Sequence, residues 1–186
     1  MSGLVDRASD PQAQLQDALD LSYTYLGHRD RTVAEVRRHL ERKRVEPAGI
    51  DGAIAELRRQ GYLDDARFAR RFADDRRRLD AWGAERIERR LGALGVDPGL
   101  AAAAAAEGDG HDELEAAVAL LRRRLRTAPR TDRDRERALG LLVRRGYELE
   151  LAYDAVRALE RDAWREGARG GRIAPDLTQY YDPGSE

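Results

Sequence analysis

Apolar residues recur every three or four positions along most of the chain, and no segment alternates apolar and polar residues with the period of two expected for a strand. Helical spacing of this kind places the apolar side chains of a segment on one face. The stripes comprise Leu15, Ala18, Leu19, Ser22 and Leu26; Val33, Val36 and Leu40; Ile50, Ala53, Ile54 and Leu57; Phe68, Phe72 and Leu79; Ile87, Leu91 and Leu94; Leu114, Val118, Leu121 and Leu125; Leu139, Leu142 and Val143; and Ala152, Ala155, Val156 and Leu159. The pattern predicts an all-α fold.

The stripes also repeat at an interval of 51 residues, which separates Leu40 from Leu91 and Leu91 from Leu142. The same shift aligns Val36 with Ile87 and Ala138, Val45 with Val96 and Tyr147, Ala53 with Ala104 and Ala155, and Ile54 with Ala105 and Val156. One unit of three short helices could hardly bury its own stripes, whereas stacked units share a core. We therefore predict an elongated, curved array of three tandem three-helix repeats, because chance alignment of leucines would not extend to so many positions.

Glycine and proline mark where helices end and begin. Gly61, Gly95 and Gly146 suit the left-handed residue that closes a helix. Pro47 and Pro98 suit the first turn of the next helix, where a missing N–H costs nothing.

These breaks divide the chain into four segments. Residues 1–62 hold an N-terminal segment and the first repeat, residues 63–108 the second repeat, and residues 109–164 the third. Residues 165–186 contain glycines and prolines without helical spacing, and we expect a disordered tail. The Tyr180–Tyr181 pair in this tail could be a docking element, although most such pairs have no role.

Two adjacent carboxylates stand in the sequence GYLDDARF, residues 61–68. Such a pair suits a catalytic couple or a metal site, but it also suits helix capping. Asp64 stands at a natural N-cap and Asp65 in the first turn, where the helix dipole favours negative charge. Leu63 and Phe68 have the spacing of a hydrophobic staple, and Tyr62 can pack into the corner. We therefore predict that Gly61, Tyr62, Leu63, Asp64, Asp65, Arg67 and Phe68 have structural roles at the junction of the first two repeats.

Candidate chemistry is otherwise scarce. The chain has no Cys, its three histidines (His28, His39 and His111) lack ligand spacing, and ARGGR at 168–172 lacks the strand and ending of a phosphate-binding loop. We expect no catalytic residue, metal or cofactor. Charged residues make up 37% of the chain, which suits thin helical units with much exposed surface. No segment resembles a signal peptide or could span a bilayer, so we expect a cytoplasmic protein.

Arginine is unevenly distributed, although the net charge is only −1. Basic residues outnumber acidic residues between Arg58 and Arg145, which can mark an interaction face or only a solvated helical surface. The candidates for partner or DNA contact form two groups. The first comprises Arg67, Arg70, Arg71, Arg77 and Arg78, and the second comprises Arg122, Arg123, Arg124, Arg126 and Arg130. Because Asp74 and Asp75 lie within the first group and Asp132 follows the second, part of this arginine content is expected to pair internally.

The order of these motifs resembles the RecX family of recombination regulators. The likeness rests on GYLDDARFA, a following basic helix and WG turn, IERRLGALGV, and a late LLVRRGYELELAYDAV, and it covers roughly Leu15 to Glu160. Arg44 departs from it, because the other two repeats have Gly95 and Gly146 there, so the second helix of the first repeat could end differently.

The resemblance implies a monomeric regulator, mainly an inhibitor, that binds RecA and the RecA filament on single-stranded DNA, in the contexts of DNA recombination, DNA repair and the SOS response. Direct binding of single-stranded DNA stays open. A helix-turn-helix transcriptional regulator is the alternative, suggested by VAEVRRHLERKRV at 33–45, but a 51-residue triple repeat does not explain it. A general helical adaptor is a third alternative.

Overall fold

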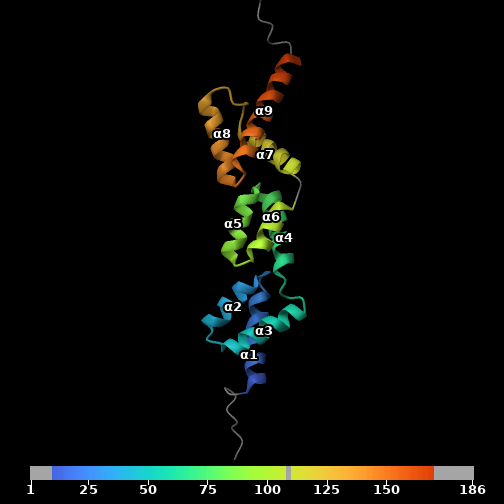
Figure 1. Cartoon of the computed structure of the whole chain (residues 1–186), viewed down its shortest axis with the longest axis vertical. Helices are drawn as coiled ribbons and strands as arrows, with labels where there is room; N and C mark the ends of the chain where they lie inside the picture. Colours follow the sequence, from blue (N-terminus) through green and yellow to red (C-terminus); the bar gives the residue numbers. More distant parts are fainter. Residues whose placement is uncertain (1–9, 108–109, 170–186) are drawn as a thin grey trace, which may run out of the picture. The chain divides into compact units, whose positions relative to one another are not determined.

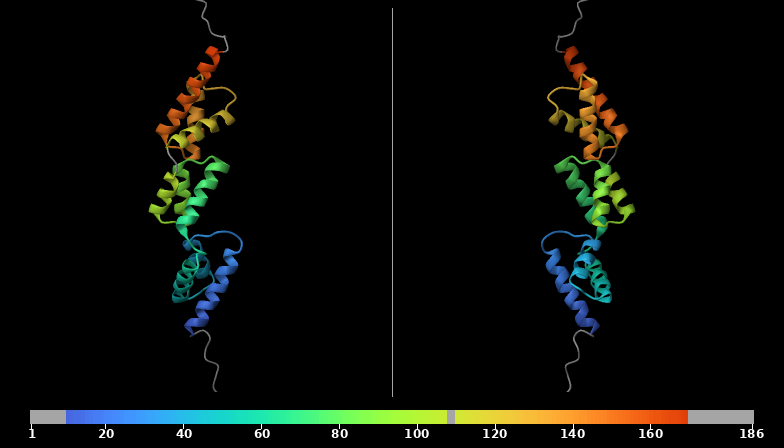
Figure 2. Two further views of the ribbon diagram at one scale, coloured as in Figure 1. Left: turned by 90° about the vertical axis from the view of Figure 1, so that its right-hand side faces the viewer. Right: turned by 90° about the vertical axis from the view of Figure 1, so that its left-hand side faces the viewer.

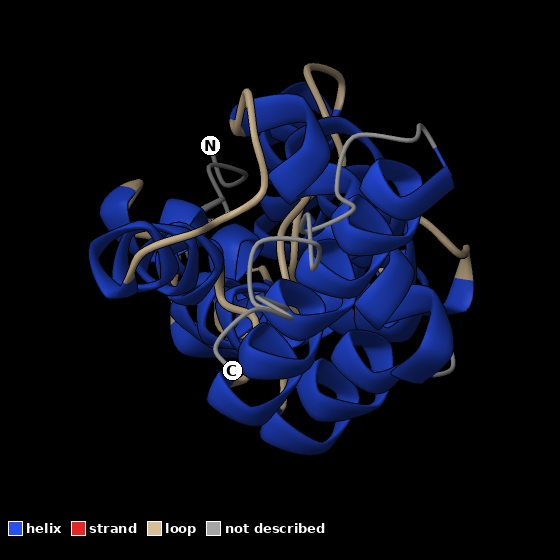
Figure 3. Ribbon diagram, turned by 90° about the horizontal axis from the view of Figure 1, so that it is seen from above, coloured by secondary structure: helices blue, strands red, loops and turns tan. Residues whose placement is uncertain are grey.

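The computed structural model describes residues 10–107 and 110–169, and every regular element in these ranges is an α-helix (Figures 1 and 3). The helices are α1 (Pro11–Leu26), α2 (Val33–Arg42), α3 (Pro47–Arg59), α4 (Asp65–Asp80), α5 (Ala84–Leu94), α6 (Pro98–Ala106), α7 (Gly110–Arg124), α8 (Asp132–Arg145) and α9 (Leu149–Arg169). The predicted all-α class is confirmed.

The 51-residue interval is present in the backbone. α2 begins at Val33 and α5 at Ala84, while α3, α6 and α9 begin at Pro47, Pro98 and Leu149. Both prolines stand in the first turn of their helices, as predicted. The helix boundaries are independent of the leucine spacing, and they confirm the predicted tandem helical repeats.

The aligned apolar positions are buried. Leu40, Leu91 and Leu142 are each 0% exposed. Val36, Ile87, Ala138, Val96, Tyr147, Ala53, Ala104, Ala155, Ile54, Ala105 and Val156 are buried as well, and Val45 is partly buried. Leu79 and Val143 were expected in the stripes but are 74% and 44% exposed. Both lie in the last turn of their helices, and a single exposed apolar residue is common on protein surfaces.

The helices form two compact units. The first contains α1 to α6 together with Arg145–Glu148, and the second contains α7, most of α8 and α9. The four-segment division at residues 62, 108 and 164 stays a prediction. α9 continues to Arg169, past the predicted start of the tail, and Tyr180–Tyr181 lie outside the described residues.

In the first unit, α1 to α3 and α4 to α6 form two neighbouring groups of helices (Figure 2), and each group has its own core. The core of α1 to α3 is built from aliphatic side chains: Ala18, Leu19, Val36, Leu40, Ile50, Ala53, Ile54, Leu57 and, from the following turn, Leu63. The core of α4 to α6 is built mostly from small side chains: Ala69, Ala73, Ile87, Leu91, Val96, Ala101, Ala104 and Ala105. Phe68, Phe72 and Trp82 pack against the second core and supply bulk at its edge.

The turn after the second helix of each repeat is left-handed. Gly95 and Gly146 have φ values of 86° and 84°, and Arg44 has a φ of 61° at the equivalent position. The predicted departure at Arg44 is therefore wrong, because the backbone ends in the same way with an arginine in place of glycine. That conformation is strained for any residue with a Cβ atom.

In the second unit, α7 packs along α9. Ala117, Val118, Leu120 and Leu121 of α7 are buried, as are Ala152, Ala155, Val156 and Leu159 of α9. These residues recur at helical spacing on one face of each helix, which is the arrangement that the apolar stripes predicted.

Candidate partner-binding surfaces and the repeat junction

The adjacent aspartates hold the start of α4. The Asp64 side chain accepts a hydrogen bond from the Arg67 backbone N–H at 2.9 Å, which is the predicted N-cap. The Asp65 carboxylate accepts one from the Val33 N–H at 2.9 Å, so it joins α4 to the start of α2. Desolvation by burial raises the pKa of Asp65, although the hydrogen bond from Val33 works in the opposite direction.

The rest of the motif packs around this turn. Gly61 has a φ of 77°, and its carbonyl accepts a hydrogen bond from the Arg67 guanidinium at 2.6 Å. Tyr62 is 58% exposed and lies edge-on to Tyr23, with 5.4 Å between the ring centroids. Leu63 belongs to the first core.

Phe68 packs against the core of α4 to α6, whereas Leu63 belongs to the core of α1 to α3. Each side chain is therefore buried by a different core, and the predicted staple between them does not explain their burial.

A second set of bonds joins the same two repeats. The Thr32 hydroxyl caps α2 by accepting from the Glu35 N–H, and it donates to the Leu94 carbonyl at 2.8 Å. Glu35 pairs with Arg29 at 2.5 Å. Burial opposes ionisation of Glu35, but hydrogen bonds from Arg29 and Thr32 and the charges of Arg29 and Arg31 outweigh it, so the pKa of Glu35 lies below its usual value.

Most candidate arginines of α4 are used inside the protein. Arg67 bonds the Gly61 carbonyl, Arg71 pairs with Asp30 at 2.7 Å, Arg77 bonds the Ala104 and Ala105 carbonyls, and Arg78 lies 3.6 Å from Asp75. Arg70 is exposed and makes no ion pair or side-chain hydrogen bond among the described residues. The structure therefore leaves Arg70 as the α4 arginine most available to a partner.

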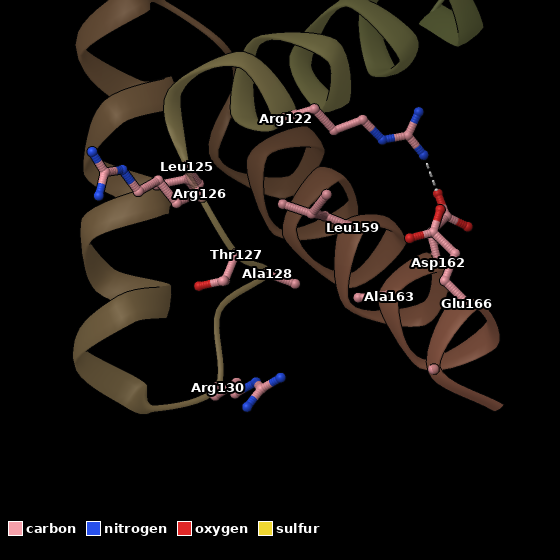
Figure 4. Close-up of a pocket in the computed structure, with 11 residues that line it drawn as sticks. Arg122, Leu125, Arg126, Thr127, Ala128, Arg130, Leu159, Asp162, Ala163 and Glu166 are labelled. Carbon is pink, nitrogen blue, oxygen red and sulfur yellow. Dashed lines mark hydrogen bonds and ion pairs between the residues drawn. The ribbon is translucent and has the colours of Figure 1, made fainter. Parts of the chain in front are cut away.

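The second group lies at the end of α7 and in the following loop (Figure 4). Arg122 reaches Asp162 of α9, with 2.6 Å between Nη2 and Oδ2. Arg122, Arg126 and Arg130 line an open hollow beside α9, and Asp162 and Glu166 line it too. Positive charge in this hollow is therefore offset by two carboxylates.

Arg123 and Arg124, the remaining members of the second group, are exposed in the last turn of α7. Within residues 10–107 and 110–169, neither makes an ion pair or a side-chain hydrogen bond, so both are available to a partner.

A third basic group lies outside the residues singled out from the sequence. Trp82, Arg86, Arg89, Arg90 and Ala93 line an open hollow of about 530 Å³ along α5. The signal for it was present in RIERRLGA, residues 86–93, because positions 86, 89, 90 and 93 have the spacing of one helix face. The basic face of this stretch was not among the predicted contact residues.

Other kinds of site find no support in the part of the chain that the structure describes. No group of three or more His, Cys, Asp or Glu residues there could hold a metal ion. No helix among those residues is long and apolar enough to cross a membrane.

Sequence comparison places these helices in a known family. The model of the first three-helix domain of RecX matches residues 18–57, and that of the second matches residues 64–104. The regulatory protein RecX of Amycolatopsis mediterranei is 31% identical over 149 residues, which cover 79% of this chain and 85% of that protein. This chain belongs to the RecX family. A RecX of Stenotrophomonas maltophilia is 34% identical over 137 residues, covering 74% of this chain and 81% of that one.

The RecX of Lactobacillus delbrueckii is 36% identical over 87 residues, which span 47% of this chain and only 32% of that protein. Solved structures show the same fold. The crystal structure of RecX from Lactobacillus salivarius has a TM-score of 0.73 at 17% identity, covering 81% of this chain and 99% of that one. A second RecX crystal structure has a TM-score of 0.67 at 19% identity, covering 80% and 73%.

Proposed function

We propose that this chain is a non-enzymatic regulator of RecA that acts mainly as an inhibitor. It binds RecA and the RecA filament on single-stranded DNA, in the groove of that filament, and thereby acts in DNA recombination and repair. The observation that carries the proposal is the similarity to proteins named regulatory protein RecX along most of the chain, 79% in the Amycolatopsis mediterranei protein. We expect it to act in the cytoplasm as a monomer without a cofactor.

Among the ten arginines predicted from the sequence, those that would contact the partner are the exposed ones without an internal bond. They comprise Arg70 of α4 and Arg123, Arg124, Arg126 and Arg130 of the second group. Arg67, Arg71, Arg77, Arg78 and Arg122 are weaker candidates, because each would have to release a bond that it makes within the protein. A guanidinium already paired with a carboxylate also has less charge to offer an acidic surface.

ATP turnover by RecA filaments preformed on single strands tests the proposal. Addition of the purified chain should lower the steady-state rate in proportion to the amount bound. The test variant replaces Arg70 and Arg123 by Gln, and its matched control replaces the exposed Arg42 and Lys43 by Gln, which removes the same net charge. The first should inhibit more weakly than the second, and undiminished ATP turnover with the unmodified chain would reject the proposal.

The helix-turn-helix alternative makes a different prediction. A transcriptional regulator would protect one specific duplex sequence in a footprinting experiment. The proposed RecA regulator should show no such sequence-specific footprint and should act on filaments whatever sequence they are formed on.

A further inference from the structure

The hollow along α5 differs from the other basic groups in its lining. Its charged residues are three arginines, Arg86, Arg89 and Arg90, and no carboxylate lines it. The hollow beside α9 also contains three arginines, but Asp162 and Glu166 share it. An anion entering the α5 hollow would therefore meet guanidinium groups and no carboxylate in its lining.

The local sequence explains why the cations converge. Arg86, Arg89 and Arg90 lie three and four positions apart on α5, so they share a face, while Ile87 and Leu91 anchor the opposite face in the core. Arg89 and Arg90 are exposed and make no ion pair or side-chain hydrogen bond among residues 10–107 and 110–169. Two full positive charges therefore remain available at the rim.

Trp82 fixes the third arginine. The Arg86 guanidinium lies over the indole ring at 4.3 Å from its centroid, in cation–π geometry. Trp82 is itself held by Phe72, whose ring lies edge-on at 6.3 Å between centroids. Because the guanidinium is already ordered, binding a ligand there loses less side-chain entropy than ordering a free arginine would.

We propose that this hollow binds the backbone phosphates of single-stranded nucleic acid directly, without RecA. Guanidinium groups match phosphate oxygens, and proteins that bind single strands combine basic grooves with flat groups on which bases stack. The guanidinium of Arg86 on Trp82 presents such a flat face beside two free cations. An acidic peptide would use the charge but not the stacking face, so the lining favours a single strand.

This inference deepens the proposed function, because a regulator seated on a RecA filament would gain its own contact with the strand. It is nevertheless measured in the absence of RecA. A chain that inhibits RecA but does not bind a single strand through α5 would overturn this inference and leave the proposed function intact. A chain that binds the strand through α5 but leaves RecA unaffected would support this inference and overturn the proposed function.

Tryptophan fluorescence provides the readout. The exposed Trp164 is replaced by Phe in every protein, so that Trp82 alone reports, and oligothymidine is titrated at several salt concentrations. The parent protein should show a change in Trp82 emission and an affinity that falls as salt rises. Replacement of Arg89 and Arg90 by Gln should weaken binding and reduce the slope of log affinity against log salt by about 1.4, because each phosphate contact on a single strand contributes about 0.7.

The matched control replaces Arg42 and Lys43 by Gln, which removes the same net charge from exposed positions near the end of α2. This control should keep the parent slope and affinity within error. Equal loss in the two double variants would show a general effect of net charge and would overturn the inference, as would parent-like binding by the Arg89 and Arg90 variant. Poly-glutamate that changes Trp82 emission as strongly as oligothymidine would also overturn it, in favour of an acidic protein ligand. Circular dichroism checks that every variant remains helical.

Discussion

The first and second repeats build the same backbone from different side chains. α2 and α5 begin 51 residues apart, as do α3 and α6. Yet the first core is filled by leucine, isoleucine and valine, whereas alanine supplies most of the second. The fold therefore depends on where helices start and stop and on a few shared positions such as Leu40 and Leu91, rather than on one particular set of core residues.

In the second repeat, hydrogen bonds from a side chain of α4 help to hold α6, whose buried residues have little apolar bulk. α6 has three alanines in its buried face, and the Arg77 guanidinium of α4 donates to the carbonyls of Ala104 and Ala105 at 2.9 and 2.7 Å. These carbonyls lie in the last turn of α6, where no backbone N–H of the helix can reach them. An arginine in a charged run can therefore be part of the fold, as Arg77 is, although the sequence pattern made it a candidate for partner binding.

The largest difference between the repeats in the effect of a substitution on stability is expected at their equivalent left-handed turns. A Cβ atom at Gly95 would lie 2.3 Å from the Cβ of Ala34, and the φ of 86° disfavours a side chain as well. Gly95→Ala should lower the free energy of unfolding by about 2–5 kcal/mol, as the sum of left-handed strain and overpacking. Urea unfolding measures it.

Arg44→Gly is the matched change at the first-repeat turn, where Arg44 is exposed and has a φ of 61°. It should raise the free energy of unfolding by no more than about 1 kcal/mol, because relief of strain is partly offset by the flexibility of glycine in the unfolded chain. If Gly95→Ala changed the free energy of unfolding as little as Arg44→Gly, this would contradict the close contact between α2 and the turn at Gly95.

Arg77→Ala should show the second-largest effect. Loss of two hydrogen bonds from a charged group to the end of α6 should cost about 1.5–3 kcal/mol of unfolding free energy. Arg78→Ala is the control, because Arg78 is exposed and lies 3.6 Å from Asp75, and it should change stability by less than about 0.5 kcal/mol. Thermal or urea unfolding compares the two, and similar values for both would contradict the attachment of α6 by Arg77.

Asp64→Ala should cost about 0.5–2 kcal/mol, since it removes the N-cap of α4. Asp64→Asn should recover most of that loss, because an amide oxygen can accept the same bond from the Arg67 N–H. Retention of full stability in Asp64→Ala together with loss of RecA inhibition would instead identify the carboxylate as a contact to the partner.

The junction carboxylates should respond to acid in opposite directions. The pKa of Glu35 is lowered from 4.5, so its contribution to stability is present above 4.5 and lost as pH falls through the folded-state value. The pKa of Asp65 is raised from 3.8, so its contribution is present below 3.8 and lost as pH rises through the folded-state value. The chain should thus lose the Glu35 contribution on acidification while gaining that of Asp65.

Melting temperatures followed from neutral pH to below 3.8 test this pair. Glu35→Gln should make the acid-induced decrease smaller, and Asp65→Asn should make it larger. Identical pH profiles for the two variants would contradict the opposite shifts. Each variant is its partner's control, because both replace one junction carboxylate by its amide.

The repeat could be predicted from the sequence because the buried leucines, the left-handed turns and the prolines that begin helices all recur at the same interval of 51 residues. Helical burial sets the spacing of Leu40, Leu91 and Leu142, and the left-handed turns and N-terminal prolines mark the helix ends. The N-cap at Asp64 was predictable for the same reason, since it depends on a few neighbouring residues. The φ of Arg44 was not, because arginine itself disfavours the left-handed conformation that it adopts there.

Contacts within the chain between residues that lie far apart in the sequence could not be predicted either. Arg71 meets Asp30 across 41 positions of sequence, and Arg77 meets Ala104 across 27. Charge density alone cannot separate such arginines from those left free, such as Arg89 and Arg90 of α5. The spacing of the α5 arginines was visible in the sequence, but the indole that orders Arg86 and the lack of a lining acid required the structure.

Direct binding to RecA filaments tests the central claim most closely. A fluorescently labelled chain is titrated with filaments preformed on single strands, and its anisotropy is compared with that in the presence of the same strand without RecA. The account predicts tight, saturable binding to the filament and weaker, strongly salt-dependent binding to the bare strand. Absence of binding to the filament at concentrations that saturate the bare strand would contradict it.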